Sequence, residues 1–441
     1  MTTSPLESAS QPDVAVVAAD ADTPTGTPAS AWPNPRNGFL FFLGFAAIGA
    51  GMASLVPAVL TLSLKAAQID AANATTVLSV TVGVGSVFSL IAFPALGRLS
   101  DRTTGRFGRR RPFLLLGALL FILGAIGIIA AQNTFTLTLA NIVTAVGYSS
   151  AAVAFTAAIP DQLAPDRRGP ASAIVGLSLP VGAVTGLFIA QLVSPNLTLM
   201  VLIPAVIAAA GAALFAVKLG DRKLAAAERP HFGWTQFLTT FWVSPRKSPN
   251  YAWAWFSRLL LFLGVAAIQA YQAFYLIMVL HFTPDEVAQA VFLSTLVLTA
   301  AALIFASIAG KVSDRIGRRK PFVITAAVIF AVGLALASFA GSFPAFLVAI
   351  GVVGVGQGVY MAVDIALVTQ VLPDPDNPAK DLGIMNLAST LPGTIVPTVA
   401  PAVLAIGASA ANPQNFTALF LFGAIAGLLG AVLIVPIRKV R

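Results

Sequence analysis

Long apolar runs, separated by short charged or Pro- and Gly-rich segments, fill the chain from residue 38 almost to its end. A helix needs roughly 20 apolar residues to cross the hydrocarbon core of a bilayer. The pattern therefore predicts an all-α membrane protein with twelve transmembrane helices. They are expected at residues 38–64, 74–97, 112–131, 134–159, 170–193, 198–217, 251–280, 287–310, 321–340, 343–372, 383–407 and 415–437.

Composition agrees with this pattern and excludes several classes of protein. The chain of 441 residues is 57% hydrophobic and 10% charged, with a mean hydropathy of +0.88, whereas soluble domains carry about 25% charged residues. The net charge of +9 does not indicate a nucleic-acid partner, because the basic residues lie between apolar runs and not on a polar surface.

The sequence lacks the sets of side chains that most catalytic and metal sites need. There is no cysteine, and the two histidines, His231 and His281, lie far apart. Disulfides, thiol catalysis and Cys-based metal sites are thereby excluded, and a His-based metal cluster is disfavoured. No nucleotide-binding motif is present either. We therefore expect neither an enzyme nor an ATP-driven pump, and no metal or cofactor.

The polar segments predict how the chain is divided. Residues 1–36, rich in Ala, Ser, Thr, Pro and Asp, are expected to be a disordered cytoplasmic tail. Two six-helix halves, 37–217 and 251–437, flank a cytoplasmic linker at 218–250, and a basic tail follows at 438–441. Within the linker, "FGWTQFLTTFW" suits either an interfacial helix or an aromatic belt leading into the seventh span.

The distribution of positive charge predicts the orientation. Nearly all of the 26 Lys and Arg residues lie in tails and loops on one side, with Lys65 opposite and Arg258 just inside the seventh span. Cytoplasmic loops carry an excess of Lys and Arg, so both termini are expected in the cytoplasm. The protein would then be a multi-pass protein of the plasma membrane, and its high alanine content points to a bacterial cell.

A charged segment occurs twice, as "SDRTTGRFGRRRPF" at 100–113 and "SDRIGRRKPF" at 313–322. Asp101 and Asp314 each follow the second span of a half, and 60 residues later Asp161 and Asp374 each end the fourth. Equal spacing predicts a duplicated six-helix unit with a pseudo-two-fold axis along the membrane normal. In transporters built this way, the solute site lies between the halves near the midplane, and rocking of the halves exposes it alternately.

These segments carry a family resemblance. "GRLSDRTTGRFGRRRPF" and "GKVSDRIGRRKPF" resemble the loop signature of the major facilitator superfamily, and the longer first copy is similar to its glycoside–cation symporter and sucrose-transporter-like branch. "IPDQLAPDRRGPAS" resembles the junction of spans four and five in that branch, and the likeness covers roughly residues 38–437. It implies the twelve-helix fold of that superfamily and transport by alternating access.

The resemblance also implies that the charged loops latch the cytoplasmic side while the carrier faces outward. The two acids would pair there with neighbouring arginines or accept hydrogen bonds from a helix N-terminus. The alternative is that the arginine clusters serve only to hold the loops in the cytoplasm. The predicted gate residues are Asp101, Arg102, Arg109, Asp314, Arg315 and Arg318.

One acid stands apart from the other 16 because it lies well inside a span. Asp364 shares a face of span ten with Gln357 and Tyr360, at spacings of three and four residues. An ionised carboxylate in the membrane must find a partner or take up a proton. We therefore predict that Asp364 couples transport to protons or binds the solute; a purely structural salt bridge or neutral hydrogen-bonded acid is the alternative.

Span seven carries a second polar stripe, which begins at Arg258 and ends at Tyr275. Arg258 is expected either to pair with Asp364 or the gate, or to extend its charge to the membrane surface. Amide and aromatic side chains suit a polyhydroxylated ligand, since an amide both donates and accepts hydrogen bonds; packing against other helices is the alternative. The predicted solute-binding candidates here are Gln269, Tyr271, Gln272 and Tyr275, together with Gln357 and Tyr360 of span ten.

Spans four, five and eleven add weaker candidates. Asn141, Thr144 and Tyr148 share a face of span four, and Asn386 lies on a polar face of span eleven with Thr390 and Thr394. We include Asn141, Tyr148 and Asn386 among the solute-binding candidates. Prolines are expected to break or bend spans five and eleven, at Pro180, Pro392 and Pro397.

Two features differ from the sucrose-transporter pattern. Plant-type sucrose carriers have an acid within the fourth span, and residues 141–159 contain none, so Asp364 would have to take over coupling or the ion differs. The segment 176–186 weakly resembles a motif of drug–proton antiporters. The leading hypothesis is a monomeric transporter, surrounded by membrane lipid, that moves a sugar or glycoside with protons. The alternatives are a proton-coupled exporter of amphiphilic compounds and a transport-inactive membrane sensor.

Overall fold

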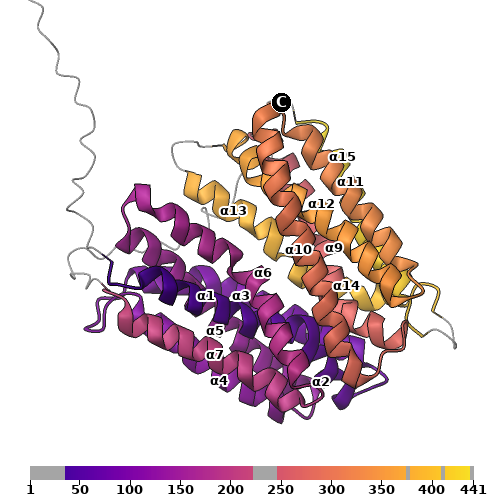
Figure 1. The fold of residues 1–441 in the computed structure, drawn as a ribbon, viewed down its shortest axis with the longest axis horizontal. Coiled ribbons are helices and arrows are strands. Elements are labelled where there is room, and N and C mark those ends of the chain that lie inside the picture. The colour runs from indigo at the N-terminus through magenta and orange to yellow at the C-terminus, as the bar shows by residue number, and fades with distance from the viewer. Residues whose placement is uncertain (1–34, 222–245, 374–377, 409–412, 438–441) are drawn as a thin grey trace, which may run out of the picture.

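A computed structural model describes residues 35–221, 246–373, 378–408 and 413–437 (Figure 1). Nearly all of the predicted disordered tail, the candidate interfacial helix, Asp374 and the basic tail at 438–441 lie outside the described residues. The described residues form helices and no strand, and twelve of the helical segments are long and apolar enough to span a membrane. The predicted all-α architecture with twelve spans is confirmed.

The first half contains six spans. Its elements are α1 (Phe39–Val56), η2 (Pro57–Thr61), α2 (Leu62–Ile69), α3 (Ala74–Asp101), α4 (Arg111–Ala130), α5 (Thr134–Gln162), η3 (Pro165–Arg167), α6 (Arg168–Leu192) and α7 (Leu197–Lys218). The elements α1, η2 and α2 form one continuous span, and η2 is a turn of π-helix that begins at Pro57.

The second half contains the other six spans. Its elements are α9 (Pro249–Met278), α10 (Pro284–Ile316), α11 (Lys320–Ser338), α12 (Phe343–Gln370), α13 (Pro378–Thr390), α14 (Pro392–Leu404) and α15 (Phe416–Ile434). The eleventh span is divided into α13 and α14 at Leu391, directly before Pro392, as expected from a residue without a backbone N–H. Pro180 and Pro397 lie inside uninterrupted helices, so they do not break their spans.

Helices within each half approach closely where glycine replaces a larger side chain. A Cβ added to Gly51 of α1 would lie 2.6 Å from the Ser178 carbonyl oxygen of α6, and one added to Gly182 of α6 would lie 2.7 Å from the Ile48 carbonyl oxygen. Small residues at crossings let helix backbones pack together in lipid, where no hydrophobic force draws helices toward one another. The glycines therefore fix how α1 and α6 cross.

The two halves meet at one end of the molecule, which we call the closed end. The Tyr271 hydroxyl of α9 and the Ser79 hydroxyl of α3 lie 2.7 Å apart, and the Gln414 amide donates to the Thr75 hydroxyl at 2.8 Å. The rings of Phe188 and of Phe292, in α6 and α10, pack 5.5 Å apart between their centroids. From this end the halves diverge, and Figure 1 shows them splaying toward the opposite end.

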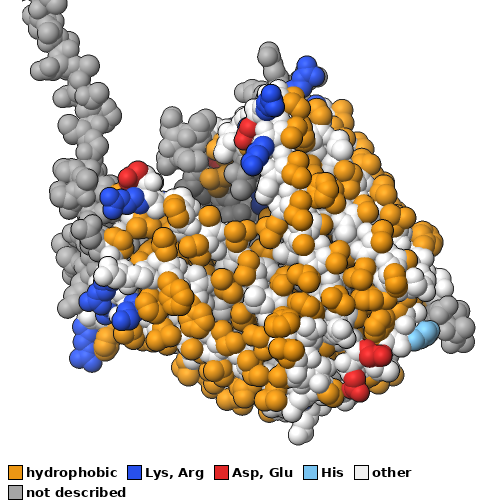
Figure 2. Space-filling model, in the orientation of Figure 1, with side chains coloured by type: hydrophobic (Ala, Val, Ile, Leu, Met, Phe, Trp, Pro, Cys, Tyr) orange, Lys and Arg blue, Asp and Glu red, His pale blue; other side chains and the backbone are white. Residues whose placement is uncertain are grey.

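That opposite end, which carries the α3–α4 loop (102–110) and the α10–α11 loop (317–319), is called the basic end. Figure 2 shows Lys and Arg side chains, with a few acids among them, along the left and upper edges of the molecule, and only acidic and histidine side chains among the charged groups at the lower right. Mostly apolar side chains cover the broad face between them. The surface is thus divided into an apolar band and two polar ends, as a spanning protein requires.

Candidate functional site

A buried ion pair joins α9 to α12. Nη1 of Arg258 lies 2.8 Å from Oδ2 of Asp364, and the two side chains are 15% and 8% exposed. The Tyr360 hydroxyl, one helical turn before Asp364, donates a hydrogen bond to the same carboxylate. Arg258 follows the start of α9 by nine residues, or about 14 Å, and Asp364 precedes the end of α12 by six, or about 9 Å. The pair is therefore inside the membrane region, toward the basic end.

Aromatic rings enclose this pair. The Arg258 guanidinium lies 5.7 Å from the centroid of the Phe262 ring, within range of a cation–π interaction. The Tyr360 ring meets Phe262 edge-on, with 6.4 Å between centroids. Phe262 thus packs against the Arg258 guanidinium on α9 and against the Tyr360 ring on α12. Because Tyr360 also bonds the Asp364 carboxylate, these contacts hold both members of the ion pair in place.

Two polar atoms on the helices that carry the pair lack a protein partner. Within the described residues, neither Nε of Arg258 nor Oε1 of Gln357 makes a hydrogen bond, although both are shielded from solvent. Buried polar atoms are seldom left unpaired in native proteins. A donor and an acceptor are therefore available on the two helices that also carry this buried ion pair.

The basic end of α9 is fastened to α13 by two aromatic residues that the sequence analysis did not select. The Tyr251 hydroxyl donates to the Asp381 carbonyl oxygen at 2.6 Å, and Nε1 of Trp255 donates to the Ile384 carbonyl oxygen at 2.8 Å. Spaced by four residues, they lie on one face of α9. Their polar tips on aromatic bodies are the signal that could have identified them. The segment that carries Arg258 is thereby held to α13.

The other polar residues of α9 do not form one surface. Tyr271 lies at the closed end, bonded to Ser79. Tyr275 lies in the core of the second half, where its hydroxyl donates to the Ala340 carbonyl oxygen at 2.7 Å and its ring stacks on Phe346. With 3.6 residues per turn, Tyr275 is rotated about 100° from Arg258, so the predicted stripe is wrong at its end. The structure does not bring Tyr275 to the ion pair.

The two glutamines of α9 are also turned away from solvent. Gln272 is 5% exposed, and Gln269 is partly buried. Both follow Arg258 along α9 and lie nearer the closed end. Asn386 of α13 differs from them, because its side chain is exposed. It lies two residues after the carbonyl that accepts the Trp255 hydrogen bond.

Polar residues of α5 line a small cavity within the first half. The cavity, of about 140 Å³, is bounded by α1, α3 and α5, and Asn141, Thr144 and Tyr148 contribute to its wall. Nδ2 of Asn141 donates to the Thr81 carbonyl oxygen at 2.9 Å. A Cβ on Gly85 would lie 2.2 Å from that nitrogen, so glycine is needed to admit the amide. The structure thus brings together the three residues that the α5 pattern placed on one face.

The charged loops at the basic end form ion pairs within each half. Asp101 pairs with Arg110 at 2.8 Å, and Arg110 also pairs with Asp161 at 2.8 Å. Arg109 adds a contact of 2.6 Å to Asp161. In the second half, Asp314 pairs with Arg319 at 2.9 Å.

Arg110 and Arg319 were therefore missed as the partners of the two repeat acids, where the sequence analysis named Arg102, Arg109, Arg315 and Arg318. Both hold the same position, two residues before the repeated proline, and this equivalence was the available signal. Arg315 and Arg318 are exposed. The ion pairs described here each join groups of a single half.

The basic residue directly before each repeated proline ties two spans of its half together. Arg111, at the start of α4, donates to the Leu219 carbonyl oxygen just after α7. Lys320, at the start of α11, donates to the Val435 and Ile437 carbonyl oxygens just after α15. The repeat thus closes each six-helix half by joining its third span to its sixth. Among the described residues no cluster of His, Asp or Glu could hold a metal ion.

Comparison with known proteins supplies a family. The model of the Major Facilitator Superfamily matches residues 40–307 and 288–441. The comparison with curated proteins finds no match. Among solved structures, a D-xylose–proton symporter has a TM-score of 0.69 at 15% identity, over 91% of this chain and 97% of that chain.

Other solved structures of similar fold carry different solutes. A peptide transporter, POT, in complex with sulfate has a TM-score of 0.69 at 15% identity, over 92% of this chain and 96% of that one. The nucleoside transporter NupG has a TM-score of 0.64 at 14% identity, over 90% and 100%. At these identities the likeness concerns the fold alone.

Proposed function

Because this chain belongs to the Major Facilitator Superfamily and is a multi-pass membrane transporter, we propose that it moves a small polar solute, a sugar or glycoside, by symport with protons. The observation that carries the proposal is the buried Arg258–Asp364 pair, with Tyr360 on the carboxylate and unpaired atoms of Arg258 and Gln357 beside it. Ionisable groups inside the membrane are costly and mark solute or proton pathways.

A proton on Asp364 would change the electrostatics of the site. The protonated carboxyl has no net charge, so Arg258 would remain as an uncompensated cation among aromatic side chains, at a cost of several kcal/mol. The guanidinium would then favour another acceptor, and oxygens of a bound solute can serve. Proton binding and solute binding thereby support each other, which is the requirement for symport.

The uncharged polar groups of the two halves favour a neutral, hydroxyl-rich solute. Asn141, Thr144 and Tyr148 in the first half, with Gln357 and Tyr360 in the second, offer uncharged donors and acceptors. Phe262 adds an aromatic face. The carboxylate of Asp364 is already neutralised by Arg258, which disfavours a cationic amphiphile as cargo. The similarity of the charged loops to the sucrose-transporter-like branch agrees with this choice.

The basic end is expected to face the cytoplasm, and the protein is expected to alternate between inward- and outward-facing states. The excess of Lys and Arg at the basic end supports a cytoplasmic location for that end, in the plasma membrane. The halves join at the closed end and diverge at the basic end, as in an inward-facing carrier. In the outward-facing state, Asp101, Arg102, Arg109, Asp314, Arg315 and Arg318 would approach one another and hold the basic end shut.

The test is flux through the purified protein in liposomes under an imposed pH gradient, with disaccharides, monosaccharides and cationic dyes as cargo. We expect gradient-driven uptake of a sugar. Asp364→Asn should abolish gradient-driven accumulation while leaving solute exchange across the membrane at equal pH. Asp166→Asn, an exposed acid of the same charge, is the matched control and should behave as the wild type.

The outcomes separate the alternatives. Dye flux without sugar flux identifies an exporter of amphiphilic compounds. Sugar binding without flux identifies a sensor. Gradient-driven accumulation that survives in Asp364→Asn removes the coupling role of this residue, whatever the cargo.

A further inference from the structure

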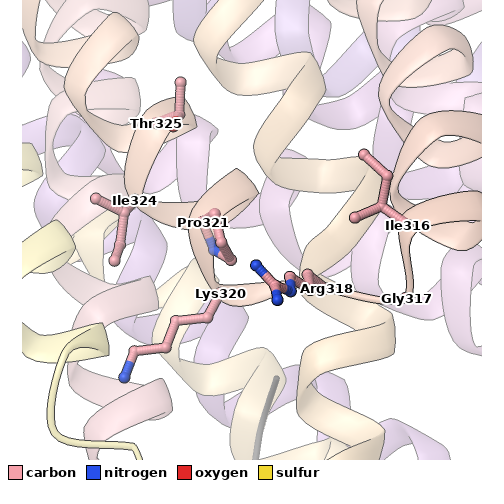
Figure 3. Close-up of a pocket in the computed structure, with 7 residues that line it drawn as sticks. All are labelled: Ile316, Gly317, Arg318, Lys320, Pro321, Ile324 and Thr325. Atoms are coloured by element: carbon pink, nitrogen blue, oxygen red, sulfur yellow. The ribbon is translucent and has the colours of Figure 1, made fainter.

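Two adjoining cavities lie at the basic end of α10 and α11 (Figure 3). The first, of about 870 Å³, is open to solvent and is bounded by residues 316–318, 320, 321, 324 and 325. The second, of about 370 Å³, runs between the two helices toward the membrane centre and has apolar walls that include Phe305, Val312 and Phe322. Pro321 and Thr325 border both cavities. Together they form one groove, polar at the basic end and apolar below it.

The polar part of the groove is strongly positive. Figure 3 shows the Arg318 side chain extending from the loop toward Pro321, whereas the Lys320 side chain runs away from Arg318 and donates to the carbonyl oxygens after α15. Lys311 and Arg315 are exposed on the last turns of α10. The nearby acid, Asp314, is already paired with Arg319, and no acid lines the first cavity.

The first half fills the equivalent place with its own carboxylate. Oδ2 of Asp221 accepts hydrogen bonds from the backbone N–H groups of Arg110 and Arg111, at 2.6 and 2.9 Å, at the start of α4. The carboxylate also sits against Gly108, where an added Cβ would lie 2.4 Å from Oδ2. An anion is thus held by a helix N-terminus and an adjacent arginine cluster.

The second half has the same donors without that acid. Its equivalents of Arg110 and Arg111 are Arg319 and Lys320, and among the described residues no carboxylate accepts from their backbone N–H groups. Gly317, the equivalent of Gly108, has nothing within 4 Å of an added Cβ. Among the described residues, the second half therefore keeps the N–H donors of this anion position without an acid that accepts from them.

We propose that this groove binds an anionic phospholipid from the leaflet at the basic end. The phosphate would lie against Arg318, Lys320 and the start of α11, in the place that Asp221 takes in the first half. An acyl chain would fill the apolar cavity between α10 and α11. This assignment is independent of the transported solute and of proton coupling.

A lipid fits better than a free anion because the polar and apolar cavities adjoin at Pro321 and Thr325. A soluble phosphate would use only the polar cavity, whereas a lipid satisfies both and reaches the groove directly from the bilayer. Basic residues near a membrane surface also attract the anionic lipids that are concentrated in the cytoplasmic leaflet. A zwitterionic lipid gains less from the same site, since its headgroup carries no net charge.

The test measures lipids retained by the full-length protein in detergent, by native mass spectrometry during titration with phosphatidylglycerol or phosphatidylcholine. We expect preferential retention of phosphatidylglycerol. Arg318→Gln should weaken it about fivefold, the effect of one basic residue near an anionic lipid. Arg167→Gln, which removes another exposed charge at the basic end of the first half, should leave the retention of phosphatidylglycerol unchanged. Lys320 is spared because it also holds α15.

The apolar part of the groove is tested separately. Val312→Trp fills the second cavity and should lower phosphatidylglycerol retention several-fold. Leu99→Trp places the same side chain at the equivalent position of the first half, which is also exposed, and should have no effect. Circular dichroism and melting curves confirm that each variant is folded.

Three results would overturn the proposal. Equal losses in Arg318→Gln and Arg167→Gln would mean non-specific attraction. Unchanged retention in Val312→Trp would mean that no acyl chain occupies the groove. Displacement of phosphatidylglycerol by an equal concentration of inorganic phosphate would assign the site to a soluble anion.

Discussion

Removing one charge of the Arg258–Asp364 pair should destabilise the protein far more than removing both charges together. At 2.8 Å between Nη1 and Oδ2, two unit charges attract with about 6 kcal/mol at an effective dielectric constant of 20. Desolvation of both groups offsets much of this attraction. Breaking a buried pair by removing one partner nevertheless costs about 3–5 kcal/mol, because the other charge is left uncompensated.

The perturbation is a double-mutant cycle of Arg258→Met, Asp364→Asn and the two together. Asp364→Asn leaves the guanidinium beside Phe262 with no anion, and we expect a loss of about 3–5 kcal/mol. The double variant removes both charges, and replacing a buried pair with neutral groups is often close to neutral. The double variant should therefore lose much less free energy of unfolding than the two single variants lose in sum.

Unfolding free energies from reversible titration with sodium dodecyl sulfate in mixed micelles provide the measurement. The exposed pair Arg167–Asp166, with 3.9 Å between charged atoms, is the control, and its coupling should be under about 1 kcal/mol. Additive losses in the Arg258 and Asp364 cycle, or single losses no larger than in the control pair, would show that water screens the site. A proton on Asp364 would then leave no uncompensated charge on Arg258, and the ion pair would not support proton coupling.

Three further predictions concern other parts of the fold. Tyr271→Phe removes a hydrogen bond between the halves worth about 1 kcal/mol, so alkylation of a cysteine introduced at the closed end should speed up several-fold; Tyr275→Phe, which removes a bond inside one half, should not change that rate. The chain has no native cysteine, so only the introduced cysteine reacts with the alkylating reagent. Asp221→Asn should lower the unfolding free energy by about 1–3 kcal/mol, because a charged acceptor of two N–H groups is lost, and the same titration measures it. Gly51→Ala should cost about 1–3 kcal/mol through a clash with the α6 backbone, whereas Gly176→Ala, with open space around it, should cost less than 1 kcal/mol in a parallel titration.

Local pattern was enough to locate the spans and the duplication. In a bilayer, each spanning segment must satisfy its own backbone hydrogen bonds, so a run of about 20 apolar residues is already a helix before any neighbour is considered. The same locality singled out Asp364, since a lone acid in an apolar run is conspicuous without a structure. It also placed Asn141, Thr144 and Tyr148 on one face, because they lie within two turns of one helix.

Partners were decided by how the helices pack. Arg258 and Asp364 lie on different spans, and only the rotation and crossing of α9 and α12 bring their charges to 2.8 Å. The direction of Tyr275 was mistaken because small departures from a 3.6-residue period accumulate along a helix. The sequence likewise could not determine which arginine pairs with Asp101 or with Asp314, since several arginines lie in the same loop as each acid.

The two copies of the charged segment show most clearly what the sequence determines and what only the tertiary structure decides. Sequence alone established that they are equivalent, because their spacing and order of charges agree. Only the tertiary structure revealed that they differ in use, since the start of α4 is capped by Asp221, just after the sixth span, and the start of α11 opens at Gly317 into a groove. Sequence fixes which charges a loop carries, but the neighbouring span decides whether those charges are satisfied within the protein or left for a ligand.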